Sequence, residues 1–162
     1  PNGLLRNDYN TQFTELEGTG AEDHGVGRGV AAADINGDGC LDLFVVNQNS
    51  PSRLLLSKCD HSNRSITLEL EGTVSNRDAV GAVVKVQTEN QTQVKFVTAG
   101  ATSVHSAQPF GIHIGVGQAE TIDTLTINWP SGVQDIFEAI DVGTMGSSNR
   151  LKVVEGSGIV SP

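Results

Sequence analysis

The segment Asp34-Ile-Asn-Gly-Asp-Gly-Cys-Leu-Asp42 alternates oxygen-bearing side chains with glycines. Glycine tolerates the backbone angles that let a short chain wrap around a small sphere. Calcium takes six to eight hard oxygen ligands at about 2.3–2.6 Å, whereas magnesium prefers a smaller octahedron and keeps its waters. Positions 1, 3, 5, 7 and 9 hold five candidate ligands, the fourth acting through its main-chain carbonyl: Asp34, Asn36, Asp38, Cys40 and Asp42. The pattern predicts a Ca²⁺ site whose shell is completed by water.

The residues after this segment distinguish it from a helix–loop–helix calcium site. The twelfth position is Val45 rather than Glu, and residues 41–47 alternate as a β-strand does. The loop is therefore expected to lead into a strand, and the ion to hold structure rather than perform catalysis. A plain turn is the alternative, because Asp, Asn and Gly are also ordinary turn residues.

The two cysteines, Cys40 and Cys59, lie on either side of two expected strands, 41–47 and 53–57. If these strands form a hairpin, the thiols nearly meet, which favours a disulfide over two free thiols. A disulfide requires an oxidising compartment, and weak calcium sites fill only where the ion is near millimolar. The expected location is therefore extracytoplasmic, meaning secreted, periplasmic or in an organelle lumen.

Composition argues against several classes of function. A net charge of −9 over 162 residues leaves no basic stripe for nucleic acid and does not suit an anionic membrane surface. The sequence contains no apolar run of 18 residues, so it predicts no transmembrane segment, and membrane association would require a partner. An acidic surface suits divalent cations or a partner with a basic face.

Short alternating segments separated by turn residues predict an all-β protein. Pro1–Arg6 resembles Pro51–Leu56 at an offset of 50 residues, a period typical of β-propeller blades. Four expected strands make one propeller-blade-like, four-stranded sheet that carries the calcium loop: 13–17, 29–34, 41–47 and 53–57. Seven later strands predict a β-sandwich: 66–70, 80–88, 93–98, 111–116, 122–129, 133–137 and 151–155. The expected domains are a blade over 1–62 and a sandwich over 63–162.

Two resemblances together cover nearly the whole chain. Pro1–Ser57 resembles an FG-GAP/VCBS repeat, the blade of integrin-like propellers, because residues 29–43 match that repeat's calcium loop and its flanks. From Ile66 onward the chain resembles the ASPIC/UnbV domain of cartilage acidic protein and its bacterial relatives. Three motifs carry this second resemblance: Ser75-Asn-Arg-Asp-Ala-Val-Gly-Ala82, Ile112-His-Ile-Gly-Val-Gly117 and Trp129-Pro-Ser-Gly132. The resemblance implies secreted or surface, calcium-dependent, non-catalytic proteins.

The sequence departs from these families in three places. Cys40 replaces a usual Asp or Asn, but this position binds through its carbonyl, so the site should survive. Ile114 stands where Phe is usual, which affects core packing. One blade is present where family members carry several, and a lone blade exposes unpaired edges. It would therefore be the end of a longer protein, pack on the second domain, or dock on a partner.

No arrangement of residues indicates an enzyme. The four histidines do not pair at metal-ligand spacing: His24, His61, His105 and His113. A nucleophile and base in the loop of His105, Ser106 and Gln108 is less favoured than a hydrogen-bonded turn. The turn Ser75–Asp78 could bind a ligand, or could be pinned by Asp78 or Arg77. Trp129 could stack on a sugar, although its strand favours a place in the core.

The expected function is a non-catalytic, calcium-binding structural or interaction protein. It would be an accessory or adhesion-type subunit of a larger extracytoplasmic or lumenal assembly, with one or more protein partners. The alternative is a carbohydrate-binding module that uses Trp129 or the turn at Ser75–Asp78. A glycan is therefore a possible second kind of partner.

Overall fold

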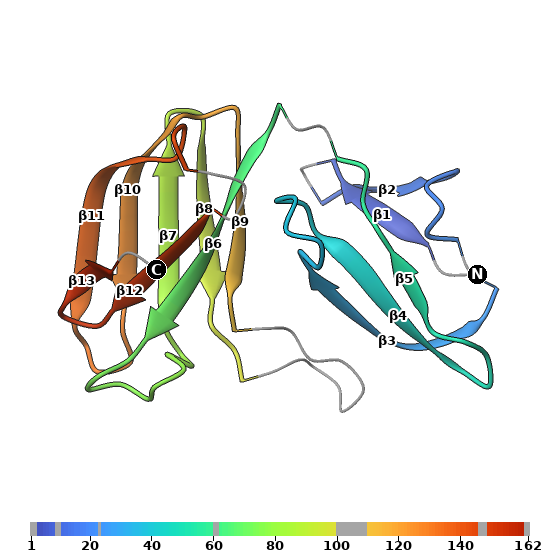
Figure 1. Ribbon diagram of the computed structural model, residues 1–162, viewed down its shortest axis with the longest axis horizontal. Coiled ribbons are helices and arrows are strands. Elements are labelled where there is room, and N and C mark those ends of the chain that lie inside the picture. Colours follow the sequence, from blue (N-terminus) through green and yellow to red (C-terminus); the bar gives the residue numbers. More distant parts are fainter. Residues whose placement is uncertain are drawn as a thin grey trace.

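The computed structural model describes residues 3–8, 11–22, 24–59, 62–99, 110–145 and 149–160. These residues form an all-β protein, which confirms the predicted fold class. The strands, in chain order, are β1 (Leu4–Asn7), β2 (Phe13–Leu16), β3 (Val26–Ala33), β4 (Asp42–Gln48), β5 (Arg53–Leu55), β6 (Arg64–Glu71), β7 (Val83–Thr88), β8 (Gln91–Phe96), β9 (Ile112–Gly117), β10 (Thr121–Asn128), β11 (Gln134–Asp141), β12 (Arg150–Val154) and β13 (Gly158–Val160). Figure 1 shows β1–β5 on one side and β6–β13 on the other. The boundary between 62 and 63 stays a prediction.

The blade sheet contains three strands, in the order β3-β4-β5, and not the four that the sequence predicted. The first of the four expected strands, 13–17, appears as β2, which pairs instead with β1 in a separate two-stranded sheet, where Leu4 lies opposite Leu16. Only a short connection separates β1 from β2, so their antiparallel pairing closes a small loop at low entropic cost. The described residues between 3 and 57 therefore form a three-stranded sheet and a separate antiparallel pair of strands.

The second part is a β-sandwich of two four-stranded sheets, β11-β10-β7-β8 and β13-β12-β6-β9. Its pairs are antiparallel except β12 and β6, which run parallel, with Leu151 opposite Leu68. Leu125 and Ile127 alternate along β10 and are fully buried, as is Ile122 near the start of the strand. Ile114, the replacement for a usual Phe, is also fully buried. The core is thus built mainly from aliphatic side chains between the two sheets, together with Trp129.

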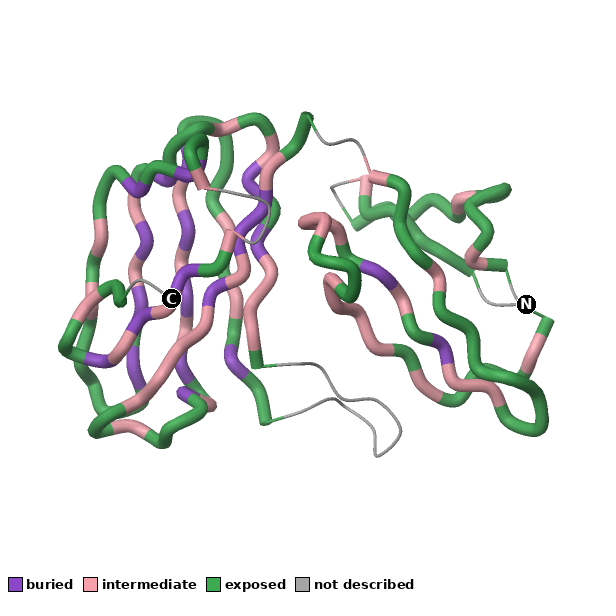
Figure 2. Tube along the Cα trace, viewed as in Figure 1, coloured by how far each residue is buried: buried purple, intermediate pink, exposed green. Residues whose placement is uncertain are grey.

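The blade contributes almost nothing to this core. Among its described residues, only Val45 and Asp42 are buried (Figure 2). Large apolar side chains remain at its surface: Leu4, Leu5, Phe13, Val26, Val30, Ile35, Leu41, Phe44, Leu54 and Leu56. The blade therefore lacks the buried apolar area that normally stabilises a small domain. No helix in the described part of the chain is long and apolar enough to cross a membrane.

Candidate metal centre

The segment 34–42 forms the loop between β3 and β4, at the end of the blade that faces the sandwich. Antiparallel pairing brings its two ends together, with Ala33 opposite Asp42. Gly37 and Gly39 have φ values of 74° and 88°, angles that residues with a Cβ rarely adopt. The two glycines thus produce the tight double turn that the sequence predicted, and the loop leads into a strand rather than a helix.

Asp34 organises the inside of the loop. Its Oδ1 accepts hydrogen bonds from the amides of Gly37 at 2.8 Å and Asp38 at 3.1 Å. Its Oδ2 accepts one from the amide of Gly39 at 2.9 Å. A negative charge is thereby surrounded by successive main-chain N–H groups, which fixes the side chain at the centre of the turn.

The next two candidate ligands contact each other. Asn36 Nδ2 donates to Asp38 Oδ2 at 2.8 Å, and the amide of Cys40 donates to Asp38 Oδ1 at 2.9 Å. Both contacts are local and part of the same turn. The structure therefore brings Asn36 and Asp38 together at the open side of the loop.

Asp42, the ninth position, is fully buried and anchors the base of the loop. Its Oδ2 accepts the amide of Ile35 at 3.0 Å, and its Oδ1 accepts the amide of Ser57 at 2.8 Å. Asp42 thus joins three segments of the blade: the loop, β4 and the chain after β5. A buried carboxylate is costly unless hydrogen-bonded, so these two amides are essential to its placement.

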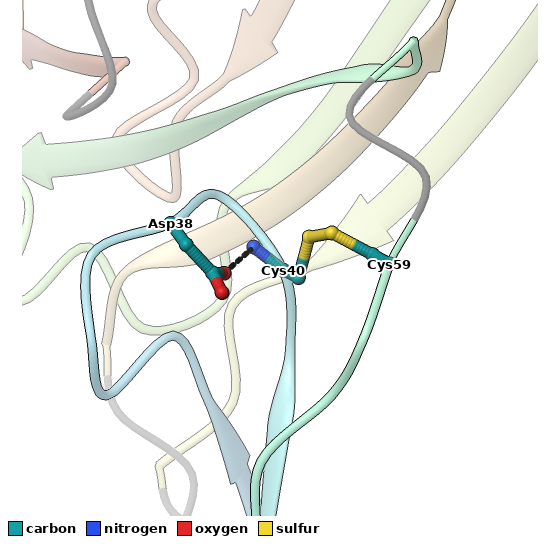
Figure 3. Close-up of side chains that lie close together, drawn as sticks. All are labelled: Asp38, Cys40 and Cys59. Carbon is teal, nitrogen blue, oxygen red and sulfur yellow. Dashed lines mark hydrogen bonds between the residues drawn. A yellow bond between two sulfur atoms is a disulfide. The ribbon is translucent and has the colours of Figure 1, made fainter.

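The donor set fits a hard cation in its chemistry, because all five candidate ligands offer oxygen. A carboxylate oxygen has two lone pairs. Asp34 Oδ1 accepts two amides, whereas Asp34 Oδ2 and both oxygens of Asp42 accept one amide each, which leaves capacity for a cation. Among the described residues, Asp38, Cys40 and Cys59 form the cluster of three ligand atoms within 4.8 Å of one another (Figure 3). Its two sulfur atoms are bonded to each other, so it offers a cation one carboxylate. Asp34, Asp38 and Asp42 do not form such a group.

The predicted disulfide joins Cys40 to Cys59, with 6.2 Å between their Cα atoms. The hairpin that suggested it is also present, since β4 pairs with β5 and Leu43 lies opposite Leu55. The bond ties the end of the loop to the chain that leaves the blade for β6. It therefore fixes the loop from a second direction.

The turn Ser75–Asp78 is pinned by a residue that the sequence did not single out. Glu155 is 3% exposed and accepts the amides of Thr73, Val74 and Ser75, each at 2.8 Å. It also accepts the hydroxyls of Ser75 and Ser131. Burial would raise the pKa of Glu155, but these donors outweigh it and lower the pKa to about 2. Asp78 and Arg77 were expected to pin the turn, but neither is among the residues that donate to Glu155.

Trp129 is a core residue rather than a platform for a sugar. It is 3% exposed, and its Nε1 donates to Asp135 Oδ2 at 2.8 Å. His113 lies on β9 facing the calcium loop; burial lowers its pKa, while the nearby carboxylate of Asp34 acts in the opposite direction. His61, His105, Ser106 and Gln108 fall outside the described residues.

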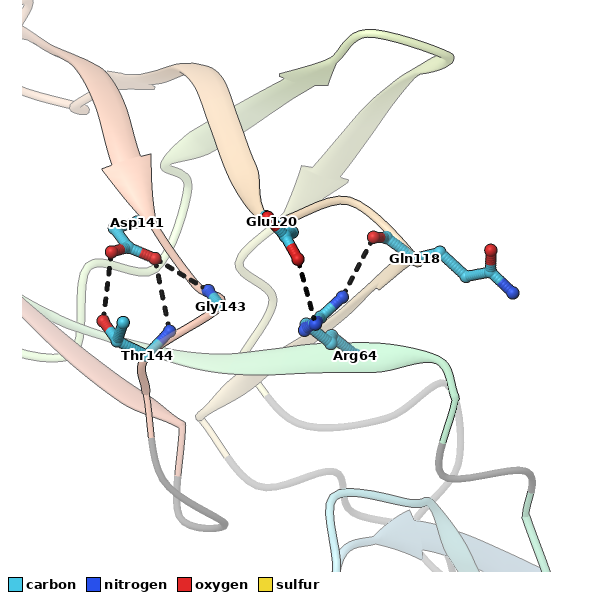
Figure 4. Close-up of polar contacts among 6 residues, drawn as sticks. All are labelled: Arg64, Gln118, Glu120, Asp141, Gly143 and Thr144. Carbon is cyan, nitrogen blue, oxygen red and sulfur yellow. Dashed lines mark hydrogen bonds and ion pairs between the residues drawn. The ribbon is translucent and has the colours of Figure 1, made fainter.

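Two further groups of polar contacts in the sandwich lie at turns and strand ends (Figure 4). Arg64 donates to the carbonyl of Gln118 at 3.0 Å and lies 3.6 Å from the carboxylate of Glu120. The hydroxyl of Thr144, with the amides of Thr144 and Gly143, lowers the pKa of Asp141. These contacts close connections between strands, and they do not assemble a nucleophile with a base.

Comparison with known proteins matches both parts of the chain. Residues 72–159, more than half of the chain, match the ASPIC and UnbV family. The chain belongs to this family. Residues 26–55 match the FG-GAP repeat, so both predicted resemblances are confirmed. These families are typically non-catalytic repeat or interaction domains of the extracellular type.

A curated relative supports the assignment. The chain is 41% identical over 63 residues to cartilage acidic protein 1 of Mus musculus, a match that covers 38% of this chain. The matched region spans 10% of that protein. The ASPIC/UnbV chain described here therefore corresponds to a small part of its relative's length.

Proposed function

We propose that this ASPIC/UnbV chain is a non-catalytic, calcium-binding structural and interaction module of an extracytoplasmic assembly. Five positions would hold the ion: Asp34, Asn36, Asp38, the carbonyl of Cys40, and Asp42. The ion would supply a double positive charge that offsets the mutual repulsion of three carboxylates within nine residues. It has no part in a reaction and stabilises the turn between β3 and β4.

The amide hydrogen bonds of Asp34 are the observation that carries this proposal. They hold its carboxylate in the middle of a turn whose other oxygen donors come from Asn36 and Asp38. A turn formed in this way loses less entropy when it closes on an ion. A bound cation would also offset the negative charge of the carboxylates, which favours the compact loop over an open one.

The interaction role rests on the surface of the blade. The blade exposes many large Leu, Val and Phe side chains. Extensive exposed apolar surface in a soluble protein often marks a site of contact with a partner. FG-GAP domains are interaction modules, and the disulfide suits an oxidising compartment. A protein partner, in an accessory or adhesion-type role, is the occupant that we propose for this surface.

Calorimetric titration with calcium, with magnesium in parallel, tests the metal site. We expect saturable calcium binding near one ion per chain and much weaker magnesium binding. Free calcium at ten times its dissociation constant should add about 1.4 kcal/mol of stability. Asp38→Ala should remove that gain, whereas Asp123→Ala, which changes an exposed acid on β10, should retain it. A melting temperature that responds to neither calcium nor chelator refutes the site.

A further inference from the structure

In the described part of the chain, a partly buried hydrogen bond joins the calcium loop to the sandwich. Ser65 Oγ, on β6, donates to the carbonyl of Gly39 at 2.6 Å. Ser65 is 8% exposed, so little water competes for this bond. Gly39 has positive φ, and a Cβ built there would lie 3.5 Å from Ser65 Oγ, which shows how closely the loop approaches β6.

The peptide group that accepts this bond also contacts a candidate ligand. The carbonyl of Gly39 and the N–H of Cys40 belong to one planar unit, whose orientation is a single variable. The N–H donates to Asp38 Oδ1 at 2.9 Å. One rigid plane therefore connects the hydroxyl of Ser65 to the carboxylate of Asp38, and the Cys40–Cys59 bond fixes the residue that follows it.

Ser65 is itself held in place from inside the sandwich. Asn149 Nδ2 donates to the carbonyl of Ser65 at 2.7 Å, and Asn149 accepts the amide of Thr67 through its own carbonyl at 2.8 Å. The pairing of β6 with β9 shifts register between Arg64 and Ser65. Ser65 lies on the same face of β6 as Thr67 and Glu69, and all three line a cavity beside the loop, so the alternation of the strand directs its side chain at the loop.

A cavity of about 410 Å³ separates the loop from the sandwich next to this bond. Asp34 and Gly39 line it from the blade, and Ser65, His113 and Asn149 from the sandwich. Asn149 Oδ1 and His113 Nδ1 are buried atoms with no hydrogen-bond partner among the described residues. Polar residues of the sandwich therefore line the cavity beside the loop.

We propose that Ser65 is a positioning residue for the calcium loop, so that ion binding and docking of the sandwich on the blade stabilise each other. Ser65 orients the Gly39–Cys40 peptide, and that peptide orients Asp38. Coupling of two binding equilibria is reciprocal, so the factor by which docking tightens calcium is the factor by which calcium tightens docking. The inference rests on the proposed calcium function and assigns a sandwich residue to it.

Calorimetric titration of Ser65→Ala with calcium tests the coupling. Loss of one buried hydrogen bond should raise the dissociation constant about two- to tenfold. Ser65→Thr keeps the hydroxyl and should restore affinity. Ser157→Ala, in the exposed turn between β12 and β13, is the matched control and should bind as the parent chain does. A purely structural role would lower the melting temperature equally in calcium and chelator and leave the dissociation constant unchanged, which overturns the inference.

Hydrogen exchange on the unaltered chain gives a second test that needs no variant. Calcium should slow exchange in β6 as well as in 34–42, and Ser65→Ala should abolish the effect in β6 alone. If the unaltered chain binds no calcium, the proposed function fails and the inference fails with it. If it binds calcium while β6 stays unaffected, only the coupling is overturned.

Discussion

Removal of the Cys40–Cys59 disulfide tests how the blade is stabilised. The two cysteines are 19 residues apart in sequence. Closing a loop of about 20 residues contributes about 3 kcal/mol at 25 °C in the loop-entropy model. Natural domains are stable by only about 5–15 kcal/mol, and the described residues of the blade bury just Val45 and Asp42. The bond should therefore supply a large share of the blade's stability.

The double substitution Cys40→Ser with Cys59→Ser removes the bond without leaving a reactive thiol. Hydrogen exchange measured in chelator separates its effect from that of the ion. We expect amides of β3 and β4 to exchange about a hundredfold faster, because a loss near 3 kcal/mol raises the open population by about that factor. Amides of β7 and β10 should be unaffected, because the sandwich has its own core.

Two outcomes would contradict this account. Unchanged protection in β3 and β4 would mean that side-chain packing, rather than the cross-link, holds the blade. Equal acceleration in β10 would mean that blade and sandwich open as one unit. Fluorescence of the single Trp129, which lies in the sandwich, provides an independent control, since its denaturation midpoint should not move.

Three further predictions concern the sandwich. Because the pKa of Glu155 is lowered from 4.5 to about 2 in the folded chain, the stability it contributes is complete above pH 4.5 and lost as the pH falls towards 2. Glu155→Gln should flatten that part of an acid-denaturation curve. Leu125→Ala, at a fully buried position, should cost about 2–5 kcal/mol of unfolding free energy in urea titration. Trp129→Phe leaves Asp135 without its indole donor and should cost about 1–3 kcal/mol, which Trp129→Phe with Asp135→Ala should partly recover.

Local patterns were enough to predict most strands and the calcium loop. Period-two alternation is decided by neighbouring residues, so the strand expected at 122–129 appears as β10 with Leu125 and Ile127 inside. The turn at 34–42 depends on two glycines and one aspartate within six residues, and it forms as expected. The disulfide was predicted from the hairpin of the strands now seen as β4 and β5, which is also a local feature. The ion-binding role of these residues stays a prediction.

Features that depend on distant partners could not be predicted. Glu155 pins a turn 80 residues away, and nothing around it in sequence differs from an ordinary strand end. The strand Phe13–Leu16 could pair either with β1 or with the blade sheet. It pairs with β1 because the connection is short, and its own residues do not indicate this. Ser65 has no motif at all. Its role depends on Gly39, which lies 26 residues earlier in the sequence and accepts its hydroxyl.

The parallel pairing of β6 with β12 has a consequence for biosynthesis. Thr67 lies beside Arg150, so β6 cannot gain this neighbour until residue 150 has been made. Contacts so far apart in sequence slow folding, and a ribosome adds about 5–20 residues per second. During that interval the edge of β6 that later pairs with β12 would remain unpaired, although the segment between Cys40 and Cys59 would already have been synthesised.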